Sequence, residues 1–281
     1  MARHASIAHP LPMRSIGLAM VCALIAYASR GAAGDTLPRR DVPRSERVLE
    51  LGVHEGVPWP IINAPIDGPL PPAPEATEPA PAPPTKAGAK VIAVIGDIQS
   101  TMRSSKYQPS TKVQVKDGVY DWDCSGMATW ILRRAAPTAW KTLASSRPVA
   151  RDFVTAIERA PLTKPRNGWQ RIAIADVMPG DLFAWRRPRG LPSKNTGHVG
   201  FVVDRARPVE GIPGAWAVQI ADSTSSHHQN DTRSADVDGG FGIGTLVFLT
   251  DASGRATSYG WAGTRSEWYI VTPILFGRVS R

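Results

Sequence analysis

Cys124 and His198 are the residues of this 281-residue sequence whose types and surroundings favour covalent chemistry. Cys124 follows Asp123, directly ahead of an apolar pattern with helical spacing. Asp123 is suited to cap that helix, because its carboxylate can accept hydrogen bonds from the free amides of the first turn. Cys124 would then open the helix, where the aligned amide dipoles stabilise a thiolate. Gly126 allows another segment or a substrate to approach this turn, although a cysteine that only opens a helix is the alternative interpretation.

His198 lies among small and apolar neighbours in an expected strand. A neutral imidazole can take a proton from a thiol and return it to a leaving amine. Cys124 and His198 are far apart in the sequence, but such a pair needs only to meet in space. Taken alone, His198 also fits the role of a hydrogen-bonded core histidine.

A polar residue on the next expected strand, at 218–224, is suited to hold the second nitrogen of the imidazole and so fix its tautomer. Asp222 and Gln219 are the candidates, and the alternation of a strand places them on opposite faces. We favour Asp222, because a carboxylate also stabilises an imidazolium. An aspartate that caps a turn at the end of the strand is the alternative.

Two other polar segments do not predict a binding site. His227, His228 and the aspartates that surround them match no metal-binding spacing, so we expect a solvated polar loop and no metal. The glycine-rich run at 239–244 lacks the Lys-Ser/Thr of a phosphate-binding loop, and we expect a turn there. No cofactor is expected.

The elements that must position these residues change in character along the chain. Apolar spacing predicts helices over 124–135, ended by Pro137, and over 149–159, with a short helix or strand over 91–95. Strands are expected at 181–185, 197–204, 215–222, 244–249 and 272–278. Helices followed by strands indicate an α+β domain with a mainly antiparallel sheet.

The N-terminal third is organised differently. Residues 1–28 have the pattern of a secretory signal peptide, with 33 as an alternative end and an uncleaved anchor as the alternative interpretation. Their apolar run of 14 residues is shorter than the roughly 20 that a spanning helix needs. No stable membrane span is therefore expected after cleavage, and we expect export to the periplasm or the extracellular space. Cleavage also removes Cys22, which leaves Cys124 as a single thiol.

Three further segments follow the signal peptide. Residues 29–62 predict no regular element, residues 63–88 form a Pro/Ala-rich linker, and the folded domain covers 89–281. Residues 1–86 are neutral, so the net charge of +9 belongs to the domain. A basic domain favours anionic partners, but the absence of a Lys/Arg-rich block argues against nucleic acid.

Three motifs together resemble the NlpC family of bacterial cell-wall cysteine peptidases. They are Asp123-Cys124-Ser125-Gly126, Pro179-Gly180-Asp181-Leu182 and Gly197-His198-Val199-Gly200. A thiol at a helix start, then a histidine and a polar residue on strands, is also the chain order of papain-like peptidases. The resemblance covers roughly residues 100–250 and implies a papain-like α+β fold, with helices packed on a mainly antiparallel sheet.

The resemblance implies Cys124 as nucleophile, His198 as base and a third polar residue near Asp222. In the family this third residue is commonly a histidine, whereas His227 and His228 come after the expected strand. The connection at 186–196 is longer and more basic than the family pattern suggests.

The resemblance also implies a tyrosine that binds the oxyanion. Its usual Tyr-x-x-Gly context is absent here. Tyr107 is the preferred counterpart, because Tyr120 lies too close to the helix start. Tyr107 and Gln219 are the candidates for oxyanion or substrate binding.

The function that the resemblance implies is that of an exported endopeptidase, which cleaves amide bonds in the stem peptides of peptidoglycan. An anionic polymer of the cell envelope suits a basic domain. A papain-like amidase or acyltransferase with another substrate is one alternative. A catalytically silent cell-wall-binding module, or an assembly protein held on the proline-rich spacer, is another. The oligomeric state stays open.

Overall fold

The structure, a computed structural model, describes residues 51–52, 61–63, 79–189, 195–234 and 239–280. The expected signal peptide and most of the expected linker lie outside the described residues. Part of the basic connection, at 190–194, also lies outside them. No helix within the described ranges has the length and apolar character needed to cross a membrane.

The helices confirm two predictions and extend a third. They are α1 (Lys86–Thr101), α2 (Cys124–Ala135), α3 (Pro137–Lys141) and α4 (Ala150–Arg159). The bounds of α2 are those predicted, although Pro137 starts α3 as well as following α2. The apolar stretch at 91–95 belongs to the longer α1, which begins within the expected linker. Thr85 explains this early start, because its Oγ1 caps α1 by accepting from the amide of Gly88 at 2.9 Å.

The strands include every one predicted and several more. They are β1 (Leu51–Gly52), β2 (Ile61–Asn63), β3 (Lys112–Gln114), β4 (Val119–Asp121), β5 (Trp169–Ile172), β6 (Leu182–Arg186), β7 (Gly197–Val202), β8 (Arg207–Pro208), β9 (Ala215–Thr224), β10 (Gly240–Thr250), β11 (Ala256–Gly260), β12 (Trp268–Val271) and β13 (Ile274–Val279). Short 3₁₀ turns lie at Val115–Asp117, Ile174–Asp176 and Gly263–Arg265. The N-terminal region, for which we expected no regular element, thus supplies β1 and β2.

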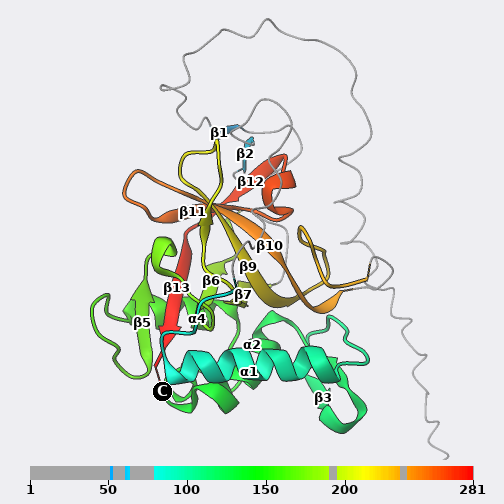
Figure 1. Ribbon diagram of the computed structural model, residues 1–281. Helices are drawn as coiled ribbons and strands as arrows, with labels where there is room; N and C mark the ends of the chain where they lie inside the picture. Colours follow the sequence, from blue (N-terminus) through cyan, green and yellow to red (C-terminus); the bar gives the residue numbers. More distant parts are fainter. Residues whose placement is uncertain (1–50, 53–60, 64–78, 190–194, 235–238, 281) are drawn as a thin grey trace, which may run out of the picture. The chain divides into compact units, whose positions relative to one another are not determined.

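One antiparallel sheet holds most of these strands. Within the described residues its order is β1-β2-β12-β11-β10-β9-β7-β6-β13-β5, with β8 beside β9, while β3 and β4 form a separate ribbon. Figure 1 shows β13 lying between β5 and β6, which come about a hundred residues earlier in the chain. Arg278 on β13 joins Asp181 ahead of β6 through an ion pair of 2.9 Å. The expected α+β class with a mainly antiparallel sheet is confirmed.

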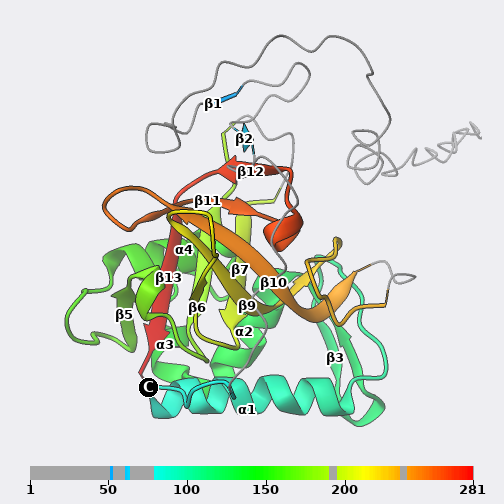
Figure 2. The same ribbon diagram turned by 45° about the horizontal axis from the view of Figure 1, so that its top comes forward.

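The two faces of the sheet pack into two separate hydrophobic cores. In β6 the side chains of Leu182 and Ala184 belong to the core that the helices cover. Phe183 and Trp185 alternate with them and belong to a second core on the other face. Figure 2 shows α1 and α2 gathered on one side of the sheet. Both faces of the central strands are therefore buried, which restricts a polar site to strand ends and to the start of a helix.

The glycine-rich run at 239–244 is not the turn that we expected. Residues from Gly240 onward belong to β10, and Gly242 and Gly244 face the loop at 227–233. A Cβ on Gly242 would lie 2.6 Å from Cγ of Arg233. A Cβ on Gly244 would lie 2.7 Å from Cβ of His228. The glycines therefore make room for this loop to lie against the sheet.

Gly242→Ala is expected to lower the free energy of unfolding by about 2–3 kcal/mol, because the added methyl overpacks the buried Arg233. Gly96 is the matched control, since it lies in α1 and a methyl added there would have nothing within 4 Å. Gly96→Ala should instead stabilise the domain by about 0.5–1 kcal/mol. Urea unfolding of the two variants beside the wild type measures both changes. Equal effects for the two substitutions would contradict this account.

Candidate active site

Cys124 is the first residue of α2, as predicted. Asp123 caps the helix, and its Oδ1 accepts from the amide of Gly126 at 2.6 Å. Gly126 also allows a close approach, because a Cβ there would lie 2.3 Å from Oγ1 of Thr111. The Cys124 side chain is buried and forms no disulfide. The start of α2 thus presents the thiol where helix amides favour a negative charge.

His198 is the partner of this thiol. It lies on β7, buried, and close enough to Cys124 for the thiol to influence its pKa. Its Nε2 lies 2.7 Å from Oδ2 of Asp222. This leaves Nδ1 as the ring nitrogen available to the thiol. The structure therefore brings the three expected residues, Cys124, His198 and Asp222, together.

The pairing of β7 with β9 explains the contact between His198 and Asp222. The register places Phe201 opposite Ala221, so His198 and Asp222 lie on the same face, diagonally across the two strands. Ser223 ties β9 to the turn ahead of Cys124, because its Oγ donates to the carbonyl of Trp122 at 3.0 Å. The strand that holds the carboxylate is thus attached to the segment that holds the thiol.

The charges of the site favour an imidazolium. Burial acts against the charged form of His198, but the negative charge of Cys124 and the hydrogen bond to Asp222 raise its pKa to about 10. Burial likewise opposes the charged form of Asp222. The charge of His228 and the hydrogen bonds from both histidines outweigh burial and hold the pKa of Asp222 well below its usual range. The site therefore favours the charged form of His198 beside Cys124.

Tyr107 reaches the same site from the segment before β3. Its backbone bridges to Trp122, two residues ahead of Cys124. Burial and the negative charges of Cys124, Asp123 and Asp222 raise the pKa of the Tyr107 phenol, so its hydroxyl stays protonated and can donate. Tyr120 is in the core instead, where its hydroxyl is 2.8 Å from Oγ1 of Thr101. Of the two tyrosines, the structure therefore places Tyr107 beside the segment of Cys124 and Tyr120 in the core.

Gln219 is not part of the site. Its side chain is exposed, on the opposite face of β9 from Asp222. The structure does not bring Gln219 together with Cys124, His198 and Asp222, because strand alternation places it on the other face of β9 from Asp222.

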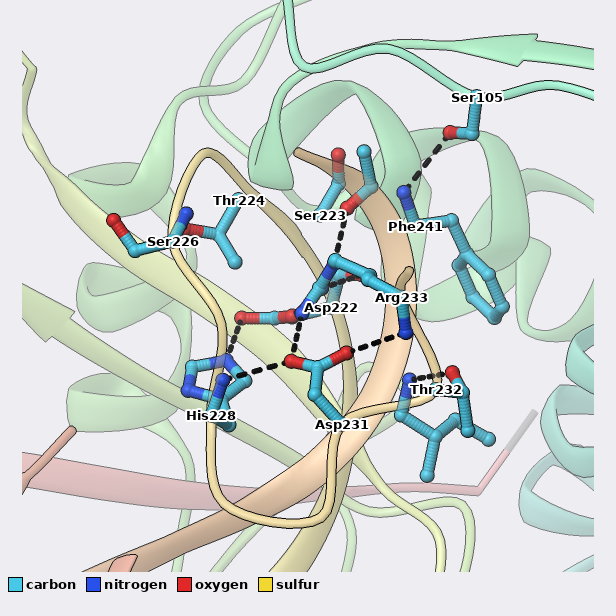
Figure 3. A network of polar contacts seen from close by, with 12 residues as sticks. Ser105, Asp222, Ser223, Thr224, Ser226, His228, Asp231, Thr232, Arg233 and Phe241 are labelled. Atoms are coloured by element: carbon cyan, nitrogen blue, oxygen red, sulfur yellow. Dashed lines mark hydrogen bonds and ion pairs between the residues drawn. The ribbon is translucent and has the colours of Figure 1, made fainter. Parts of the chain in front are cut away.

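Sequence reasoning missed two residues, His228 and Arg233. We expected a solvated loop here, but His228 and Arg233 are buried and both contact Asp222. Nε2 of His228 lies 2.9 Å from Oδ2 of Asp222. Arg233 pairs with Oδ1 of the same carboxylate and, at 2.5 Å, with Asp231. Figure 3 shows this network, and the loop is a part of the site rather than a solvated surface.

Aromatic side chains enclose one side of the imidazoles. The ring centroid of Trp185 lies 5.1 Å from that of His198. Trp261 lies 5.4 Å from His198 and 4.4 Å from His228. Such rings exclude water, and hydrogen bonds within the resulting low-dielectric region are stronger than in solvent.

The site holds polar groups but no recognisable metal centre. Among the residues that the structure describes, no group of three or more His, Cys, Asp or Glu side chains is arranged to hold a metal ion.

Comparisons of the chain with family models, with curated proteins and with solved structures find no match. The chemistry of the site therefore rests on its own geometry.

Proposed function

We propose that this protein is an exported cysteine hydrolase of the papain-like, NlpC type. Its proposed substrates are amide bonds in the stem peptides of peptidoglycan. The observation that carries the proposal is the position of a helix-starting thiol, Cys124, close to the imidazole of His198, whose Nε2 is held by Asp222. A structural cysteine has no need of such a partner.

In the proposed reaction the thiolate of Cys124 attacks the amide carbon, and a carbon–sulfur bond forms. The hydroxyl of Tyr107 and the backbone amide of Cys124 are the donors for the oxyanion, and the loss of one such donor typically costs about 3–4 kcal/mol. His198 then gives its proton to the nitrogen as the carbon–nitrogen bond breaks. Water next attacks the thioester, His198 takes its proton, and the carbon–sulfur bond breaks to release the acid and the thiol site.

The basic domain supports a substrate in the cell envelope. The whole net charge of +9 lies in residues 87–281, and anionic polymers of the wall attract such a domain. A papain-like amidase or acyltransferase would use the same residues on another amide or ester.

Digestion of purified peptidoglycan tests the proposal. The wild-type protein should release stem-peptide fragments that mass spectrometry identifies by the bond cleaved. A portion of the same preparation, treated first with iodoacetamide, should release none, because alkylation blocks the single thiol of the exported chain. Release by both samples would point to a contaminating enzyme. If neither sample released fragments but Cys124 were alkylated rapidly, the protein would still be interpreted as a thiol enzyme. Its proposed substrate would then be wrong.

A further inference from the structure

The carboxylate of Asp222 holds more cationic partners than orientation of His198 requires. Its Oδ2 meets His198 at 2.7 Å and His228 at 2.9 Å, and its Oδ1 meets Arg233. A second contact of 3.0 Å joins Arg233 to the backbone carbonyl of Asp222. The side chain of Asp222 is fully buried, so water does not satisfy these groups. Two imidazoles therefore share a single carboxylate oxygen.

Both ring nitrogens of His228 face acceptor oxygens. Its Nε2 faces the Asp222 carboxylate, and its Nδ1 lies 3.2 Å from the carbonyl oxygen of Trp261. Carboxylates and carbonyls are acceptors only, so each nitrogen must donate. Both contacts are satisfied together only when both ring nitrogens of His228 carry a proton. In that doubly protonated form His228 is a cation behind Asp222.

The loop at 227–233 is built to hold this cation in place. The amide of His228 donates to Oδ2 of Asp231 at 2.8 Å. Gln229 donates from Nε2 to Oγ1 of Thr264 at 2.8 Å, and its Oε1 accepts from the Thr264 amide at 2.9 Å. Thr232 exchanges hydrogen bonds of 2.8 and 2.9 Å with Ile243 on β10. These contacts fix the loop on two sides before any ligand binds.

The fixed charges balance around the reacting pair. The titratable and charged groups that face His228 are Asp222 on β9, His198 on β7, and Asp231 and Arg233 on its own loop. His228 and Arg233 supply two positive charges, and Asp222 and Asp231 supply two negative ones. The thiolate and the imidazolium then add one charge of each sign. The charges of these six groups therefore cancel, which limits the penalty for burying them.

We propose that His228 is a positioning residue, whose protonated imidazole acts with Arg233 to hold the Asp222 carboxylate toward His198. The unit that sets the reactivity of the thiol is then Cys124–His198–Asp222–His228 rather than three residues. This inference rests on the proposed role of Cys124 as nucleophile, and it adds a residue that acts through Asp222 without touching substrate.

Alkylation of Cys124 by iodoacetamide tests the proposal without a cell-wall substrate. His228→Ala should slow alkylation at pH 7 by about tenfold or more, because the carboxylate loses the partner that orients it. His228→Gln, whose amide can still donate to Asp222, should recover most of this loss. His227→Gln is the matched control, because His227 contacts the Ser234 carbonyl at 2.9 Å and not Asp222. It should alkylate at the wild-type rate.

The pH profile of alkylation separates positioning from a merely structural role. In His228→Gln the hydrogen bond to Asp222 remains but the positive charge is lost. The negative charge of Asp222 is then less neutralised, so it stabilises the His198 imidazolium more strongly. The inflection from loss of the His198 proton should then move to higher pH, by about one unit. With Ala the carboxylate turns away, and the inflection should move to lower pH. Wild-type rates and inflections in both variants would overturn the proposal.

Nitrogen-15 NMR of the wild-type imidazoles tests the proposal independently, because it does not require His228→Ala to fold. Both ring nitrogens of His228 should carry protons at pH 7, and a single protonated nitrogen would overturn the proposal. Failure of the proposed function has a different signature. In that case the wild-type thiol would alkylate as slowly as an ordinary cysteine, or peptidoglycan would remain uncut, while His228 still carried two protons.

Discussion

Cys124→Ala should abolish cleavage of peptidoglycan, with a fall of about 10⁵-fold or more in kcat. The side chain removed is the nucleophile of the proposed reaction, and no other cysteine lies in the exported chain as we expect it. The folded domain should remain, because alanine fits the first position of a helix that Asp123 caps. The measurement is the rate of fragment release under saturating peptidoglycan, beside circular dichroism to confirm the fold.

Gln219→Ala is the matched control for that loss. Gln219 is exposed on the far face of β9, so its truncation should leave the cleavage rate within about twofold of the wild type. If Cys124→Ala kept its activity, the thiol would have no covalent role. The binding-module alternative would then account better for the domain.

Asp222→Asn should lower kcat by about 10³-fold to 10⁴-fold while the substrate still binds. An asparagine amide keeps the shape of the side chain, but it can present a donor where His198 Nε2 requires an acceptor. The imidazole would then adopt the wrong tautomer or turn away from Cys124. KM should change little, because Asp222 is buried behind the imidazole. A loss confined to KM would contradict the role of Asp222 in orientation.

The same substitution should change the pH range of the reaction. The pKa of His198 is raised to about 10, in opposition to burial, by the charge of Cys124 and by the bond to Asp222. The imidazolium, which would protonate the leaving amine in the proposed reaction, is thus expected to persist in the wild type until pH rises through about 10. Asp222→Asn removes one of these causes, so the alkaline limit should move to lower pH. A wild-type limit near the ordinary histidine value would show that the pair is not charged.

The local parts of the site were predictable from the sequence. The start of α2 at Cys124 follows from a capping aspartate and an apolar helical period, both of which lie within a few residues of the thiol. The faces of β9 follow from strand alternation, which separates Asp222 from Gln219. Proximity of Cys124 to His198 was an expectation from chain order, and in the structure the thiol lies close enough to influence the pKa of His198.

The parts that depend on distant contacts were not predictable in the same way. His228 and Arg233 lie in a polar stretch, and their burial arises only because β10 offers Gly242 and Gly244 beneath them. Glycine at alternate positions of a strand was the available signal, since it indicates close approach of another backbone or side chain. We interpreted that run as a turn from its glycine count.

Short elements were missed for a related reason. β11 and β12 have few residues each, and β12 pairs on one side with β2, which is distant in sequence, so this contact outweighs any local preference. α1 was recognised only in its apolar middle, because its first turn carries alanine and glycine next to the proline-rich segment. Its beginning depends on the cap at Thr85, which also donates to the carbonyl of Val279 at 2.6 Å.

The position of β13 inside the sheet has a consequence for the order in which the protein matures. β5 and β6 are synthesised long before β13, yet they join one another only through it. The ion pair between Asp181 and Arg278 also waits for the same strand. A nascent chain that has not yet released residue 279 therefore lacks the connection that completes this half of the sheet. Until then the segments that carry Cys124, His198 and Asp222 lack part of the sheet that supports them in the finished domain.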